Sequence, residues 1–187
     1  MSSRGESVAL RPLELLAALE RERVYYVVIG AFAALVHGSG LSTNAIDITP
    51  SLREMNMEPL RRALAELGAE RADGRPLVVE RETLQAETVT RLRTQAGPLT
   101  LVPLPAGTRG GYDDLRRQAT REPLGGGLRP PIASLPDVVR SLAALGREED
   151  LPRLLRLRRL MELERTLQRR REPEREWERD QGLDLGL

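Results

Sequence analysis

The chain has 187 residues, a formal net charge of +1, a single histidine and no cysteine. These counts exclude disulfides, thiolate metal sites, cysteine nucleophiles and a multi-histidine metal site. The sequence contains no lysine, so any phosphate contact must come from arginine forks or backbone N–H groups.

The N-terminal half predicts helices alternating with strands. Leucines recur at helical spacing behind Pro12, a continuous apolar run precedes Gly30, and glycines stand where two helices should end. The predicted elements of this half are a helix over 12–21, a strand over 24–29, a helix over 32–37, a strand over 46–49 and a helix over 54–67.

The C-terminal half predicts more strands followed by helices. Ser134, with Asp137 three residues later, has the spacing of a helix N-cap. The predicted elements are strands over 77–79, 87–92 and 99–104 and helices over 112–119, 134–145 and 151–171. The order indicates an α+β fold, a small mixed sheet flanked by helices with a helical C-terminal segment.

We divide the chain at its composition changes. Residues 9–124 form the α+β domain, and three consecutive glycines link it to a helical segment over 125–172. Residues 173–187, rich in glutamate and arginine, are expected to be a flexible tail. Residues 1–8 are polar and expected to fray.

The region from residue 24 to 48 is the most informative part. An apolar run ends at Gly30, a short apolar helix leads to Gly38 and Ser39, and the next strand carries Asp47. Nucleotidyl transfer needs such parts, because a backbone turn must hold a triphosphate and carboxylates must hold divalent metals. Two acids separated by one residue would share a strand face and a metal pair.

These segments resemble the AbiEii-type and mycobacterial toxin-like nucleotidyltransferases. The resemblance extends from about residue 24 to about residue 163. It rests on segments 26–30, 33–39, 43–48, 56–69, 105–108, 111–115, 132–141 and 146–151. It implies a polymerase beta-type fold, an NTP substrate, Mg²⁺ or Mn²⁺ as cofactor, and tRNA or another acceptor.

The resemblance also implies roles for particular residues. Asp47 and Asp150 would be catalytic, with Asp47 the metal ligand. The residues expected to bind the nucleotide are Gly30, Ala31, Gly38, Ser39 and Arg147. Structural alternatives stay open. Asp47 could cap a strand end, His37 could pack at a helix end, and Ser39 could cap a turn. Asp150 could be a helix N-cap, and Arg147 could pair with Asp150 or Glu149.

Several expected groups are missing. Ala45 stands where Asp-x-Asp would begin, Thr100 where a third carboxylate is expected, and Leu142 where a lysine is common. Whether Ala45 is natural or engineered stays open. We therefore expect weak or absent transferase activity, and alternatively a non-catalytic module that binds a partner protein or nucleic acid.

The partners are inferred less directly. Arginines recur over 153–171, which could line an RNA path, although interleaved glutamates favour a solvated ion-pair face. A cognate antitoxin or an active homologue is the other candidate partner, as in a toxin–antitoxin-like system. No apolar run reaches the roughly 20 residues that span a bilayer, so we expect a cytoplasmic bacterial protein and no membrane partner.

Overall fold

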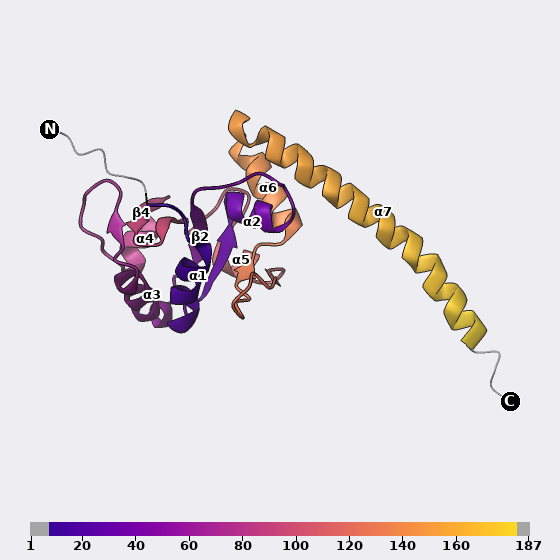
Figure 1. Cartoon of the computed structure of the whole chain (residues 1–187), viewed down its shortest axis with the longest axis horizontal. Helices are drawn as coiled ribbons and strands as arrows, with labels where there is room; N and C mark the ends of the chain where they lie inside the picture. The colour runs from indigo at the N-terminus through magenta and orange to yellow at the C-terminus, as the bar shows by residue number, and fades with distance from the viewer. Residues whose placement is uncertain (1–7, 183–187) are drawn as a thin grey trace.

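The computed structural model describes the backbone of residues 8–182 and the side chains of residues 8–167 (Figure 1). Within this part the sheet has seven strands in the order β3-β4-β5-β2-β1-β7-β6. The strands are β1 Tyr26–Ile29, β2 Ile46–Pro50, β3 Glu70–Arg71, β4 Thr90–Thr94, β5 Gly97–Leu101, β6 Thr120–Arg121 and β7 Pro131–Ile132. The helices are α1 Pro12–Arg21, α2 Gly30–Val36, α3 Glu54–Glu66, α4 Arg81–Ala86, α5 Tyr112–Leu115, α6 Leu135–Leu145 and α7 Leu151–Gly182.

The sheet is mixed. β2 runs antiparallel to β1 and parallel to β5, and β1 runs parallel to β7. The outer pairs, β3 with β4, β4 with β5 and β6 with β7, are antiparallel. Helices flank this sheet, so the predicted α+β architecture with a helical C-terminal segment is confirmed.

The two faces of the central strands differ in chemistry. Ile48 lies opposite Leu101, and both are fully buried in the aliphatic core. One residue along, Asp47 lies opposite Thr100 on the other face. Because side chains alternate along a strand, the register of β2 and β5 separates the core from a polar face.

Asn56 fixes the ends of the two central strands. Its side-chain oxygen accepts from the Tyr25 N–H at 2.7 Å, and its amide donates to the carbonyls of Tyr25 at 3.0 Å and Ser51 at 2.8 Å. The residue is completely buried. A fully satisfied amide of this kind holds α3 against the start of β1 and the end of β2.

The C-terminal helices follow the predicted signals. The Ser134 hydroxyl accepts from the Asp137 N–H at 3.3 Å, and Gly146 adopts the left-handed conformation after α6. A short 3₁₀ turn, Glu148–Asp150, leads into α7, which packs on α6 and then runs away from the sheet (Figure 1). No helix in the described chain is long and apolar enough to cross a membrane.

Some predicted elements were wrong. Residues 77–79 form no strand, because Val79 is buried by packing while its carbonyl accepts from Arg61 at 3.0 Å rather than from a ladder. The helix at residue 112 is one turn long, and α4 was not anticipated. Helix α7 continues through the predicted boundary at 172–173, while residues 1–7 and 183–187 lie outside the described part.

Candidate functional site

Asp47 lies in a row of side chains that crosses four strands. In β2 it pairs with Ile29 of β1 on one side and with Thr100 of β5 on the other. Thr100 pairs in turn with Arg91 of β4. Directly paired residues project to the same face of a sheet, so a carboxylate, a hydroxyl and a guanidinium stand in line.

Gly30 brings the backbone against this carboxylate. It is the first residue of α2 and has a φ of +66°, which L side chains rarely adopt. A Cβ placed at this position would lie 2.5 Å from Oδ2 of Asp47. Glycine at the strand-to-helix turn therefore gives the Asp47 side chain its space.

A small cavity covers the row. Its volume is about 200 Å³, and it lies between the polar face of the sheet and α6. The residues that define its chemistry are Gly30, Asp47, Arg91, Thr100, Leu142 and Arg147. Among its lining residues in the described structure Asp47 is the one carboxylate, while two arginines reach it from different elements.

Neighbouring groups shift the pKa of the Asp47 carboxyl in opposite directions. Burial raises the pKa of the Asp47 carboxyl above its ordinary value of 3.8, and the charge of Asp150 adds to the rise. The Thr100 hydroxyl and the positive charges of Arg147 and Arg91 pull the pKa down. Desolvation is the largest effect, so the neutral form is favoured relative to a free aspartate.

The other acids near the sheet are committed elsewhere. Asp150 is largely buried and pairs with Arg153 at 3.0 Å. Glu87 accepts from Arg71 at 2.7 and 2.9 Å. Over the described residues, no group of three or more histidine, cysteine, aspartate or glutamate side chains could hold a metal ion.

The remaining predicted site residues divide into two groups. Gly30 and Arg147 line the cavity with Asp47, while Ala31, Gly38 and Ser39 do not. Ser39 is buried, and its carbonyl accepts from Arg156 of α7 at 3.0 Å. A nucleotide-binding role for all five residues stays a prediction.

The environment of His37 agrees with its structural alternative. Its Nε2 lies 2.7 Å from the Ala133 carbonyl, which connects the end of α2 to the segment between β7 and α6. This contact occupies one ring nitrogen of the chain's only histidine.

Sequence reasoning missed Arg91. The alternation of Thr90, Leu92 and Thr94, all buried, with exposed Arg91 and Arg93 marks a strand with one polar face. That signal predicts which way Arg91 points. It does not bring Arg91 near Asp47, because their proximity also depends on the pairing of β5 with β2, whose residues are distant in sequence.

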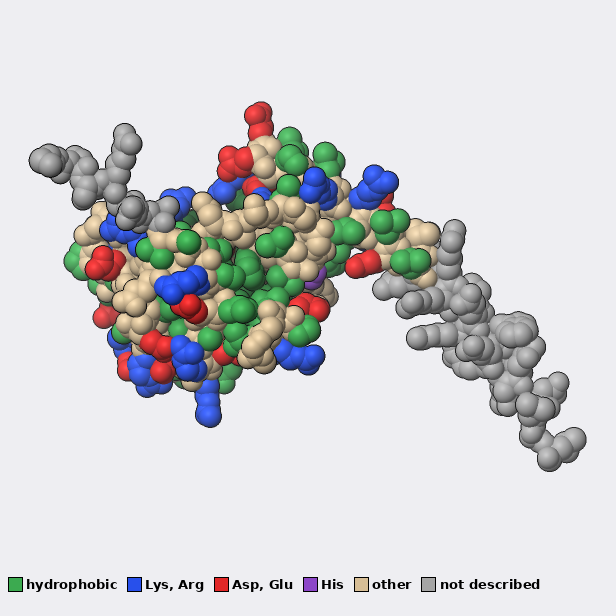
Figure 2. Space-filling view, viewed as in Figure 1, with side chains coloured by type: hydrophobic (Ala, Val, Ile, Leu, Met, Phe, Trp, Pro, Cys, Tyr) green, Lys and Arg blue, Asp and Glu red, His purple; other side chains and the backbone are tan. Residues whose placement is uncertain are grey.

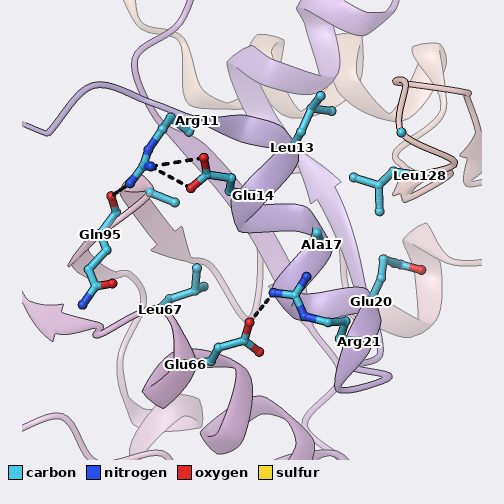
Figure 3. A pocket seen from close by; sticks show the side chains of 12 residues that line it. Arg11, Leu13, Glu14, Ala17, Glu20, Arg21, Glu66, Leu67, Gln95 and Leu128 are labelled. Carbon is cyan, nitrogen blue, oxygen red and sulfur yellow. Dashed lines mark hydrogen bonds and ion pairs between the residues drawn. The ribbon is translucent and has the colours of Figure 1, made fainter.

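A larger cavity shares no lining residue with the Asp47 cavity (Figure 3). It has a volume of about 820 Å³ and is bordered by α1, the end of α3 and the β4–β5 turn. Both of its arginines are paired within the protein, Arg11 with Glu14 and Arg21 with Glu66, while Glu20 accepts from the Tyr26 hydroxyl at 2.8 Å. A charged ligand would have to break these pairs, so the Asp47 cavity is the better candidate site.

The mixed sheet and its flanking helices have a nucleotidyltransferase-like fold, as two solved structures show. The chain resembles a putative nucleotidyltransferase from Thermotoga maritima with a TM-score of 0.50 and 20% identity, over 76% of this chain and 90% of that one. It also resembles the antibiotic-resistance factor ANT(2'')-Ia with a TM-score of 0.50 and 14% identity, over 90% and 94% of the chains. No protein-family model matches, and no curated protein matches in sequence.

Proposed function

We propose that this chain is a nucleotidyltransferase-fold protein that uses its cleft to bind nucleic acid and not to transfer nucleotides. The observation that carries the proposal is the row itself: Asp47 is followed across the sheet by Thr100 and Arg91, where a metal site would need further carboxylates. A cytoplasmic location and a toxin-like ancestry are part of the same proposal.

The donor set does not fit a pair of Mg²⁺ or Mn²⁺ ions. Two-metal catalysis depends on carboxylates that hold the ions in place. Asp47 is accompanied by a hydroxyl and by two guanidinium groups, Arg91 and Arg147, whose positive charge opposes a second cation. We therefore derive no step through a metal.

The same groups suit a phosphate. Arginine forks bind phosphate oxygens through paired N–H donors, and two of them face the cavity. A volume of about 200 Å³ is smaller than the roughly 300–1,000 Å³ of sites that enclose a whole small-molecule ligand. One phosphate of a longer chain fits this space better than an enclosed NTP.

Helix α7 adds support for a nucleic-acid partner such as tRNA. Arg153 and Arg156 are used inside the protein, bonding Asp150 and the Ser39 carbonyl. Arg158, Arg159 and Arg165 are exposed, and Figure 2 shows basic, acidic and hydrophobic side chains along the described part of α7. Basic groups outside the cleft would hold a backbone that enters it.

A partner protein is the second candidate. Leu142 lines the cavity and Leu145, at its rim, is 42% exposed. An apolar wall at this position suits a protein partner, such as a cognate antitoxin or an active homologue that this chain would regulate.

The test of the proposal is a transfer assay with each labelled NTP, Mg²⁺ or Mn²⁺, and bulk tRNA, beside a tRNA-binding measurement. We expect binding without label transfer, and weaker binding by an Arg91→Gln/Arg147→Gln variant. Metal-dependent transfer that Asp47→Asn abolishes would overturn the non-catalytic assignment. If the Arg91→Gln/Arg147→Gln variant binds tRNA as tightly as the parent chain, the cleft is not the binding site.

A further inference from the structure

A third cavity opens at the far ends of β2 and β5. Its volume is about 470 Å³, and no residue lines both this cavity and the Asp47 cavity. Because the two strands are parallel, the segments that follow them, containing Ser51 and Pro103, emerge at the same edge of the sheet. Helix α4 and the loop before α5 complete the walls.

Three arginines from separate segments line this third cavity: Arg53, Arg81 and Arg109. The one carboxylate among its lining residues, Asp113, is shared, since the same oxygen meets Arg53 at 2.9 Å and Arg116 at 2.8 Å. No ion pair among the described side chains includes Arg81 or Arg109. The residues that line the cavity therefore include three arginines and one carboxylate, which is itself shared with Arg116.

The loop that carries Arg109 is held in place by its backbone. Oδ2 of Asp114 accepts from the N–H groups of Arg109 at 2.9 Å and Gly110 at 2.6 Å. Gly111 has a φ of +53°, and a Cβ there would collide with the carbonyl of Pro103. These contacts fix the base of the Arg109 side chain, which lowers the ordering cost of binding.

The remaining walls are apolar. Leu52, Pro103, Leu104 and Tyr112 line the cavity, and Leu104 is 54% exposed. A volume of about 470 Å³ lies within the roughly 300–1,000 Å³ of small-molecule sites, which combine apolar walls with a few polar anchors. A ligand that suits this lining has an anionic part and a planar or apolar part.

We infer that this third cavity binds a phosphorylated small molecule, with the phosphate held by Arg81 and Arg109 and a planar ring packed on Leu104 and Tyr112. Guanidinium forks supply the paired N–H donors that phosphate oxygens accept. The inference stands apart from the Asp47 cleft and does not depend on its function.

The test is calorimetric titration of the full chain with ATP, AMP, adenosine and inorganic phosphate at 0.15 M salt without divalent metal. Arg81→Gln/Arg109→Gln removes the proposed anchors. Arg23→Gln/Arg129→Gln removes the same net charge from exposed positions that line neither cavity, and Arg91→Gln/Arg147→Gln reports on the Asp47 cavity. Thermal unfolding of each variant shows whether it is folded.

We expect the nucleotides to bind at least about tenfold more tightly than adenosine or inorganic phosphate, and the Arg81/Arg109 variant to lose at least about tenfold in affinity. The Arg23/Arg129 variant should bind like the parent chain. Equal losses in these two variants would show attraction by net charge only. A loss confined to the Arg91/Arg147 variant, or no binding of either nucleotide, would also overturn the inference.

Discussion

Gly30 and Asp47 are packed so closely that no side chain fits between them. The φ of Gly30 is +66°, and a Cβ on it would lie 2.5 Å from the Asp47 carboxylate oxygen. A side chain at position 30 would therefore destabilise the fold in two ways. An L side chain would be strained by the backbone conformation, and it would also displace the carboxylate that faces the cavity.

We expect Gly30→Ala to lower the free energy of unfolding by about 2–4 kcal/mol, of which about 1–2 kcal/mol comes from the left-handed backbone. Denaturant unfolding measures this. Gly126→Ala is a matched control, because Gly126 has a φ of +58° but nothing within 4 Å of the added Cβ. Equal losses in the two variants would show that the contact with Asp47 has no cost.

Asn56 offers a second stability test. Replacing it with leucine leaves the N–H of Tyr25 and the carbonyl of Ser51 without the Asn56 partner, while the carbonyl of Tyr25 keeps the Ser51 N–H at 2.8 Å. We expect a loss of about 2–4 kcal/mol in the free energy of unfolding, because each orphaned buried group costs about 1–3 kcal/mol. Asn44→Leu, at an exposed position, should change stability by less than about 0.5 kcal/mol.

The raised pKa of Asp47 predicts a pH dependence with a definite sign. Because burial raises the pKa above 3.8, the folded chain holds the proton more tightly than the unfolded chain. Ionisation therefore costs stability as pH rises from about 4 through the raised pKa. We expect Asp47→Asn to gain stability relative to the parent chain over that interval, measured by urea unfolding at a series of pH values. A pH-independent difference would contradict the burial effect.

The ion network around Arg71 predicts the opposite slope. Arg71 is buried and bonds Asp73 at 2.8 and 2.9 Å and Glu87 at 2.7 and 2.9 Å. These bonds lower the pKa of both carboxyls below their ordinary values. Their contribution is complete above about pH 4.5 and is lost as pH falls through the lowered values.

We therefore expect the Tm of Arg71→Gln to fall less than the Tm of the parent chain as the pH is lowered below about 4.5. Arg75→Gln is the control, since Arg75 is 65% exposed and meets the same carboxylates from the solvent side. An acid slope that is unchanged in Arg71→Gln would contradict the network's role.

Restoring carboxylates tests what separates this cleft from a metal site. Ala45 stands two residues before Asp47, and Thr100 lies opposite it. We expect Ala45→Asp/Thr100→Asp to gain Mn²⁺ binding, seen as a rise in Tm of about 5–10 °C at a hundredfold excess of Mn²⁺ over its Kd. Ala45→Asn/Thr100→Asn should show no such rise. An equal rise in the parent chain would contradict our interpretation of the donor set.

The sequence predicted the elements that have strong local signals. The apolar run before Gly30, the leucine spacing of α1 and the pairing of Ser134 with Asp137 all correspond to observed structure. Elements without such signals were missed. Helix α4 buries only Leu84, so it has no apolar periodicity, and the two-residue strands are defined by their partners alone.

The candidate site divides in the same way. Resemblance could name Asp47 and the unusual residues Ala45 and Thr100, because these depend on order along the chain. The arrival of Arg91 beside Asp47 depends on the pairing of β5 with β2, which joins segments distant in sequence. Such contacts arise only when the whole sheet has formed, so no local pattern contains them.

The length of the β4–β5 turn affects how this cleft can change in evolution. Gly97, with a φ of +107°, follows the two-residue turn that sets Arg91 opposite Thr100. One residue gained or lost in that turn would shift the β4 register, turn the guanidinium towards the core and place Leu92 or Thr90 in the row. A change in the length of a surface turn could therefore alter the cleft's charge as effectively as a substitution within it.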